Sequence, residues 1–137
     1  MKVKKLFLLI IVLSAFGSIP AFSQDFAYIE NLSPVQKQQL SRVYQAYKQE
    51  NNSLEMRIIN YKDKLIQLQD VSDISVEQIE LLRTSYERNI KVLTTEQERL
   101  KAQTEQRYKN IMSPEQYKQY LAQQMQVENA FNEFLRK

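Results

Sequence analysis

The hydrophobic positions in the middle of the chain follow the spacing of a helix seam. From residue 34 to residue 69 they recur in alternating steps of four and three, which is the repeat of a coiled-coil heptad. The seam consists of Leu40, Tyr44, Tyr47, Leu54, Ile58, Tyr61, Leu65 and Leu68. Asn51 occupies the one seam position without an apolar side chain, and the run Asn51-Asn52-Ser53 predicts a kink, a short break or a new helix start near residues 51–53.

Two further segments carry apolar stripes with helical spacing. One runs from residue 75 to residue 111, with Gln97 and Thr104 at seam positions, and the other runs from residue 114 to residue 135. The connector at residues 70–73 is short and polar, so the first two helices should fold back on each other as an antiparallel α-hairpin. A helix over residues 75–111 would be about 55 Å long, which favours packing along a partner chain. These patterns predict an all-α fold of long antiparallel helices.

Three helix starts carry the pattern of a capping box. In this motif a serine side chain accepts a hydrogen bond from the third backbone amide of the helix, and a glutamine at that third position reaches back to the serine. The three pairs are Ser33 with Gln36, Ser75 with Gln78, and Ser113 with Gln116. Pro34 and Pro114 follow the first and the third serine, at the helical position where a missing N–H costs nothing.

The first 23 residues have the three parts of a secretory signal peptide. Lysines lie at positions 2, 4 and 5, an apolar run covers residues 6–13, and small residues follow at 21–23. The apolar run is too short to span a bilayer comfortably, so we expect no stable membrane insertion. Cleavage after residue 23 would leave one helical domain, residues 24–137, as an exported protein.

This leader also accounts for the basic charge of the chain. The whole sequence has 19 Lys and Arg against 16 Asp and Glu, a net charge of +3, and the three basic residues in excess are the leader lysines. In the remaining chain the two signs balance and are interleaved. That distribution disfavours nucleic-acid binding, which depends on clustered positive charge.

Missing residue types exclude several kinds of chemistry. The chain has no Cys and no His, so it lacks the usual zinc ligands and the cysteine or histidine pairs of nucleophilic catalysis. Its one glycine, Gly17, lies in the leader, which disfavours β-hairpins and glycine-rich phosphate-binding loops in the rest. We therefore expect no enzyme activity, no cofactor and no metal site.

Tyrosine is the enriched residue type, with 8 in the chain. Tyrosine suits surfaces that meet apolar and polar groups together, because its ring can be buried while its hydroxyl keeps a polar partner. A candidate client-binding surface is formed by Arg42, Tyr44, Tyr47, Arg57, Tyr61 and Tyr86. The alternative is that most of these tyrosines are half-buried core residues of a thin helical layer. Phe26 and Tyr28 suggest, in addition, a flexible apolar arm near the start of the domain.

The two boxes that contain proline resemble a known motif. Leu32-Ser33-Pro34-Val35-Gln36 and Met112-Ser113-Pro114-Glu115-Gln116 are similar to the paired LTxxQ motifs of the Spy/CpxP family of periplasmic proteins. The order and separation of the elements are similar across nearly the whole exported chain. By position, the motif roles of capping and packing fall to Leu32, Ser33, Pro34, Gln36, Met112, Ser113, Pro114 and Gln116.

The resemblance implies a fold and a function. The fold is an all-helical α-hairpin subunit that forms a thin, curved, cradle-like homodimer in the periplasm. The function is that of an ATP-independent chaperone, which binds unfolded or partly folded envelope proteins and suppresses their aggregation. Serine replaces threonine in both motifs and keeps the capping hydroxyl, while the lack of His and Cys argues against the metal-linked relatives. Two alternatives stay open: an envelope stress-response modulator that binds one dedicated protein partner, and a structural coiled-coil scaffold.

Overall fold

The computed structural model describes residues 26–137, and within that range the chain forms helices and no strands. The prediction of an all-α fold is confirmed. The expected signal peptide, residues 1–23, lies outside the described residues. In chain order the elements are η2 (Phe26–Tyr28), α2 (Pro34–Gln67), η3 (Leu68–Asp70), α3 (Val76–Ile111) and α4 (Pro114–Arg136).

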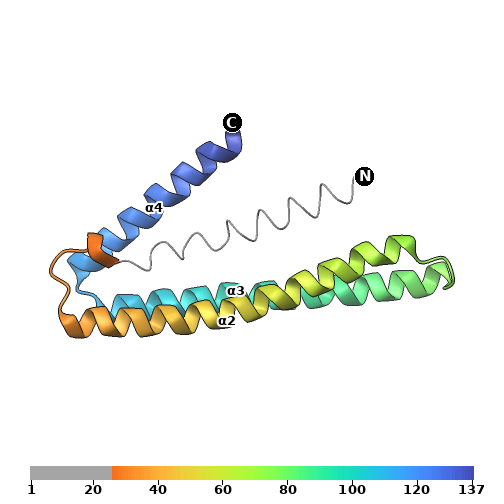
Figure 1. Ribbon diagram of the computed structural model, residues 1–137, viewed down its shortest axis with the longest axis horizontal. Coiled ribbons are helices and arrows are strands. Elements are labelled where there is room, and N and C mark those ends of the chain that lie inside the picture. The colour runs from red at the N-terminus through yellow and green to blue at the C-terminus, as the bar shows by residue number, and fades with distance from the viewer. Residues whose placement is uncertain (1–25) are drawn as a thin grey trace.

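Helices α2 and α3 are the long elements of the structure and lie side by side in opposite directions (Figure 1). They contain 34 and 36 residues, which corresponds to about 50 Å each at 1.5 Å per residue. The short element η3 and the residues after it connect them at one end. At the other end the chain turns from α3 into α4, and α4 points away from the pair (Figure 1).

Each of the three long helices begins with a complete capping box. The side chains of Ser33, Ser75 and Ser113 accept the amide N–H three residues later, and the glutamine there accepts the N–H of the serine. This reciprocal pair satisfies two backbone donors that would otherwise have no partner at the helix start. Helix α3 is ended at Met112, because Pro114 follows and disfavours a helical conformation before it.

The expected break near residues 51–53 is wrong, because α2 continues through this segment without interruption. Asn51 is buried, and its side-chain oxygen accepts a hydrogen bond from Nε2 of Gln97 on α3 at 3.2 Å. Asparagine disrupts helices mainly by bonding to its own backbone. Here the side-chain amide of Asn51 is bonded to Gln97 on α3 and does not compete for its own backbone, so the helix is not interrupted.

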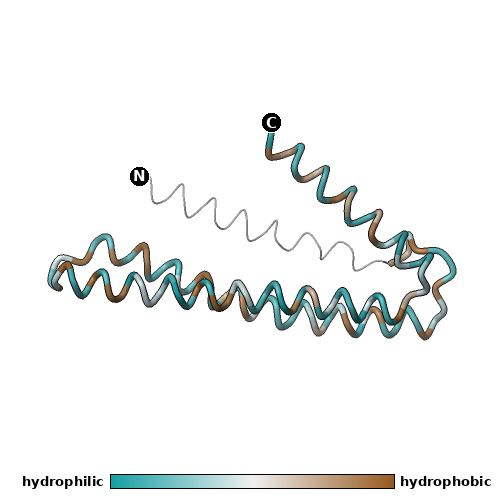
Figure 2. Tube along the Cα trace, turned by 180° about the vertical axis from the view of Figure 1, so that it is seen from behind, coloured by the Kyte–Doolittle hydropathy of each residue, from teal (hydrophilic) through white to brown (hydrophobic). Residues whose placement is uncertain are grey.

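The apolar core consists of two separate clusters, and the larger one also takes in the segment before α2 and the start of α4. Brown and teal positions alternate along both helices, as expected for amphipathic helices (Figure 2). The larger cluster lies where α4 begins and contains Phe26, Ile29, Leu32, Leu40, Tyr44, Tyr108, Met112 and Tyr120. The smaller one is made of Leu54, Ile58 and Leu93. Along α2 the buried, polar Asn51 lies between residues of the two clusters and is bonded to Gln97 of α3.

The expectation of a flexible apolar arm at Phe26 and Tyr28 is also wrong. Phe26 is buried in the larger cluster, and Tyr28 packs against that cluster. The rings of Phe26 and Tyr108 meet edge to face with centroids 5.5 Å apart, a favoured geometry for aromatic pairs. The segment before α2 is thus part of the core at this end of the molecule.

Within residues 26–137, no helix combines the length and the hydrophobicity that crossing a bilayer demands.

A proline placed in the middle of α2 tests whether the helix is continuous. Asn52 is exposed in the middle of the helix. Asn52→Pro should lower the free energy of unfolding by about 3 kcal/mol, because proline removes a helical hydrogen bond and clashes with the preceding turn. Asn52→Ala is the control and should stabilise the protein slightly. Urea unfolding followed by circular dichroism measures both; equal midpoints for Asn52→Pro and the unchanged protein would indicate a break after all.

Candidate functional site

The two motifs meet at the end of the molecule where α2 begins, α3 ends and α4 begins (Figure 1). We call this region the clasp and define it by the motif residues Leu32, Ser33, Pro34, Gln36, Met112, Ser113, Pro114 and Gln116. The structure therefore brings all eight motif residues together.

Gln36 is the first of two glutamines that link the motifs. Its Oε1 accepts the backbone N–H of Ser33 at 2.9 Å, which completes the local capping box. Its Nε2 donates across the clasp to the backbone oxygen of Ile111 and to Oε1 of Gln116, both at 2.9 Å. One side chain thus caps its own helix and binds the end of another.

Gln116 makes the matching contacts in the opposite direction. Its Oε1 accepts the N–H of Ser113 at 2.9 Å, and its Nε2 donates to the backbone oxygen of Asn31 at 3.0 Å. Ile111 and Asn31, the two backbone acceptors, each lie two residues before the capping serine of their motif. The clasp therefore has an approximate twofold symmetry, in which each glutamine binds the segment that precedes the other motif.

The segment before α2 is shaped to receive these bonds. Asn31 has a φ of 61°, in the left-handed region, which asparagine tolerates better than most residues. The N–H of Glu30 donates to Oε1 of Gln119 on α4 at 2.8 Å. Side chains of α4 therefore hold the chain on both sides of the turn at Asn31.

Apolar side chains of the motifs lie beneath these polar contacts. Leu32 and Met112, which precede the two capping serines, are both buried in the larger cluster. Leu40 and Tyr120 each lie seven residues after a capping serine, and they too are buried there, Leu40 fully. The twofold relation of the motifs thus extends into the core. The motif residues cap helices and pack in the core, which are structural roles.

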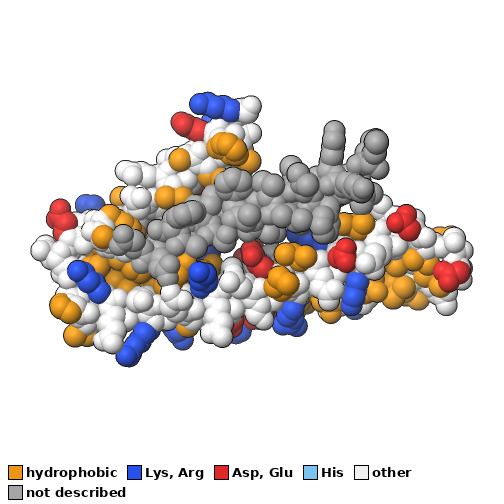
Figure 3. Space-filling view, viewed as in Figure 1, with side chains coloured by type: hydrophobic (Ala, Val, Ile, Leu, Met, Phe, Trp, Pro, Cys, Tyr) orange, Lys and Arg blue, Asp and Glu red, His pale blue; other side chains and the backbone are white. Residues whose placement is uncertain are grey.

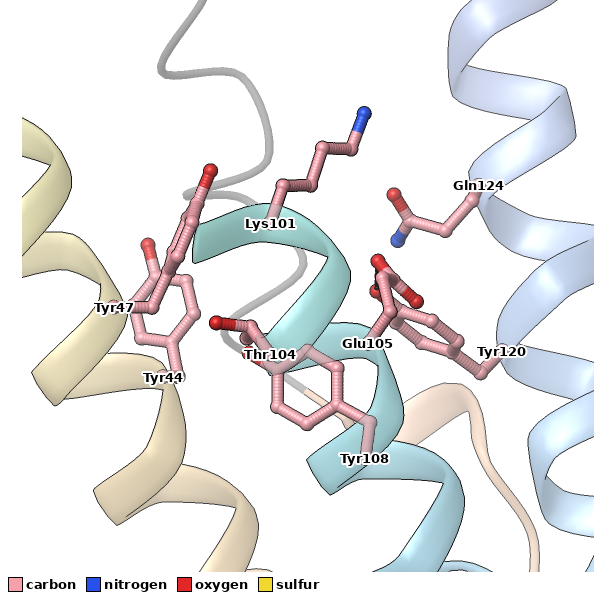
Figure 4. Close-up of a pocket in the computed structure, with 8 residues that line it drawn as sticks. All are labelled: Tyr44, Tyr47, Lys101, Thr104, Glu105, Tyr108, Tyr120 and Gln124. Atoms are coloured by element: carbon pink, nitrogen blue, oxygen red, sulfur yellow. Dashed lines mark hydrogen bonds between the residues drawn. The ribbon is translucent and has the colours of Figure 1, made fainter. Parts of the chain in front are cut away.

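A small cavity lies next to the clasp, between α2, α3 and α4 (Figure 4). We call it the tyrosine cavity, and its volume is about 60 Å³. It is lined by Tyr44, Tyr47, Lys101, Thr104, Glu105, Tyr108, Tyr120 and Gln124. Four of these eight side chains are tyrosines and one is a carboxylate, so the lining combines aromatic rings with a negative charge.

The rings on the α4 side of the cavity are tightly associated. Tyr108 and Tyr120 meet edge to face with centroids 5.4 Å apart, and Tyr117 stacks on Tyr120 at 5.9 Å. The Tyr120 hydroxyl donates to Oε1 of Glu105 at 2.7 Å. This bond joins α4 to α3 through a charged acceptor, which makes it stronger than a bond between neutral groups.

Burial raises the pKa of several tyrosines around the cavity. The pKa values of Tyr108 and Tyr120 lie well above the usual 10.0, first because the hydroxyls are shielded from water. The carboxylate of Glu105 raises them further, since a second negative charge nearby is unfavourable. The pKa of Tyr28 is raised by the same two causes. Gln124 partly offsets the rise at Tyr28, although its Nε2 does not reach hydrogen-bond geometry with that hydroxyl.

The six residues of the candidate client-binding surface do not form one exposed face. The prediction that Tyr44 lies on a surface is wrong. Its side chain is only 2% exposed, because its seam position turns it toward α3. Tyr47 lines the tyrosine cavity and is half-buried. Arg42 and Arg57 are exposed on α2.

Tyr61 and Tyr86 form a separate pair near the connected ends of α2 and α3. Their ring centroids are 6.0 Å apart, and Nζ of Lys64 lies 5.2 Å from the first ring and 5.8 Å from the second. A lysine this close to two tyrosine rings makes favourable cation–π contacts. This pair therefore joins the two helices rather than adding to a continuous tyrosine surface.

The outer faces of the helices expose large apolar side chains. The exposed set includes Val35, Met56, Val76, Leu81, Val92, Leu121 and Met125. In Figure 3, apolar side chains gather where α2 and α3 are connected, with charges of both signs beside them. Within residues 26–137 no group of three or more acidic side chains could hold a metal ion.

Several residues of these sites have no clear signal in the sequence. Glu105, Gln119 and Gln124 resemble many other polar positions on exposed helix faces. One signal exists in retrospect: Tyr120 and Gln124 are one helical turn apart, as are Lys101 and Glu105, so each pair shares a helix face. Whether this face of α4 meets that face of α3 depends on the direction of α4.

Removal of the clasp glutamines tests the contribution of the bonds between the motifs. Gln36→Ala and Gln116→Ala should each lower the free energy of unfolding by about 2 to 3 kcal/mol, because a cap and several partly buried hydrogen bonds are lost. Gln78→Ala is the matched control, since the side-chain bond recorded for Gln78 is local, to Ser75. The control should lose about 1 kcal/mol or less. Urea unfolding measures all three; equal losses would mean that the bonds between motifs add nothing.

The tyrosine pKa values predict that alkali destabilises the protein. Above about pH 10 the unfolded chain loses its phenolic protons, whereas folded Tyr108 and Tyr120 keep theirs. The free energy of unfolding should therefore be constant just below that pH and fall as the pH rises further. Urea midpoints at about pH 8 and about pH 11, with tyrosinate absorbance, measure this. Tyr108→Phe should reduce the fall, and a midpoint independent of pH would contradict the burial of these hydroxyls.

No protein-family model, curated protein or solved structure matches this chain. A proposal for its function therefore depends on the clasp, the tyrosine cavity and the exposed apolar side chains, together with the motif resemblance.

Proposed function

We propose that the protein is an ATP-independent periplasmic chaperone that binds unfolded or partly folded envelope proteins and suppresses their aggregation. The observation that carries the proposal is the exposure of large apolar side chains among charges along two helices of about 50 Å. Unfolded chains present apolar and charged groups in no fixed order, so a surface that offers both over a long distance can bind many of them.

Two shallow grooves illustrate this mixed surface. The groove on α3 places Val76 and Leu81 beside Glu77, Glu80 and Arg88. The groove on α2 places Met56 and Ile59 beside Arg57 and Asp63. Both combine apolar side chains with charges of both signs, which supports weak binding of varied polypeptides rather than recognition of one shape.

The thin shape of the subunit fits a dimer of the proposed kind. Helices α2 and α3 pack on each other along their length and meet α4 only at one end, so much of their outer surface is left for a second copy and for a client. In the proposed assembly two subunits pair antiparallel into a curved cradle, with the client on the concave side. The motif resemblance supports this arrangement, and the leader supports the periplasmic location.

An aggregation assay tests the chaperone function directly. The purified protein, at near-stoichiometric amounts and without nucleotide, should delay the aggregation of a chemically reduced test protein. Light scattering follows the delay, beside an inert helical protein of similar charge. No delay at a several-fold excess would contradict the proposal and favour a regulator with one dedicated partner.

A matched pair of variants tests whether the exposed apolar side chains are responsible. The triple variant Met56→Ser, Val76→Ser, Leu81→Ser should lose most of the delay, because all three side chains are exposed in the grooves. The control replaces three exposed glutamines, Gln38→Ser, Gln45→Ser and Gln103→Ser, and should keep it. Both variants should unfold near the same urea concentration as the unchanged protein, since surface substitutions affect stability little.

A further inference from the structure

The tyrosine cavity contains a carboxylate without a cationic partner. Glu105 is half-buried, and its one recorded hydrogen bond comes from the Tyr120 hydroxyl to Oε1. Within residues 26–137 the ion pairs are Arg83 with Glu80 and Arg99 with Glu96, so Glu105 has no positive partner at ion-pair distance. A partly desolvated carboxylate is less stable than an exposed one unless an opposite charge lies nearby.

Lys101 lines the cavity but does not neutralise Glu105. It lies one helical turn before Glu105 on α3, and in Figure 4 its ammonium group points out of the cavity and away from the carboxylate. Its carbon chain forms part of the wall, as is common for lysines at a boundary with water. The interior therefore keeps the negative charge of Glu105.

Tyrosine rings complete the walls around this charge. Tyr44 and Tyr47 come from α2, Tyr108 from α3 and Tyr120 from α4 (Figure 4). The field of Glu105 reaches most of this group, because the carboxylate contributes to the raised pKa of Tyr47, Tyr108 and Tyr120. Aromatic rings with a carboxylate at one side form a cage that attracts cations, and its preferred ligands are organic ammonium groups.

The cavity has the size of such a group. Its volume of about 60 Å³ is several times the roughly 15 Å³ that one water needs on the same measure. This leaves room for an ammonium nitrogen with its carbon substituents.

We propose that the tyrosine cavity is a binding site for an alkylammonium cation, with Glu105 as its counter-ion. The cation enters past Tyr47 and Lys101, its positive charge lies near Oε2 of Glu105, and its carbon substituents contact the tyrosine rings. Two sources carry this chemistry: a free quaternary amine, or the side chain of a lysine in a polypeptide. The site does not depend on chaperone activity, because a small cation is bound without any client.

Titration with two probes tests the proposal and separates the sources. Tetramethylammonium chloride represents the free amine, and Nα-acetyl-lysine methylamide represents the lysine side chain. The chain has no Trp, so its intrinsic fluorescence comes from its 8 tyrosines, and the four that line the cavity make this signal sensitive to binding there. A saturable change with either probe, beyond that of equal sodium chloride, supports the site and identifies its source. No saturable change with both probes overturns it.

Three variants of the full chain should weaken, strengthen and leave unchanged the binding of the cation. A purely structural role of Glu105 would not produce this pattern. Glu105→Gln keeps an acceptor for Tyr120 but removes the charge, and should weaken binding about tenfold or more. Lys101→Gln removes a nearby positive charge and should strengthen binding about threefold. Glu98→Gln removes an exposed carboxylate of the same helix and should leave binding unchanged. Equal affinities for Glu105→Gln and the unchanged protein would overturn the proposal even if a probe binds.

Discussion

The exchange of hydrogen bonds between Gln36 and Gln116 determines how the ends of the three long helices are placed. Each side chain completes its own capping box with oxygen and binds the other motif with nitrogen, so the two helix starts are joined to each other. Helix α4 has few other contacts with α3 along its length (Figure 1). Its direction follows mainly from the clasp, from the Tyr120–Glu105 bond and from the aromatic cluster beneath them.

The core of this protein is unusual in relying on tyrosine. The larger cluster contains three buried tyrosines, and a fourth lines the adjoining cavity. The Tyr120 ring is buried while its hydroxyl keeps a polar partner in Glu105, which is the combination that tyrosine allows and leucine does not. The tyrosine cavity lies among these rings, with Glu105 in its lining. Packing and candidate chemistry therefore depend on the same side chains.

Much of the fold follows from local sequence patterns. Seam residues such as Leu40 and Ile58 predict α2 because their spacing reflects one helix packed on another, and the serines before Pro34 and Pro114 mark the helix starts. Local patterns mislead at Asn51, because its side chain is bonded to Gln97, which lies 46 residues away. They do not predict the tyrosine cavity, since Glu105 and Tyr120 meet only when α4 has taken its direction. Patterns within one helix identify that helix; they do not identify what three helices enclose together.

The choice of glutamine at the clasp also determines which conditions can open it. The bonds between the motifs join uncharged amides and backbone carbonyls, with no carboxylate and no ammonium group among their donors and acceptors. Ionic strength screens interactions between charges, and acid acts on groups that take up protons; neither changes an amide. An equivalent clasp built from an arginine and a glutamate would weaken in salt or acid. The bonds between the motifs are therefore insensitive to the salt and acid that weaken the surface ion pairs of α3.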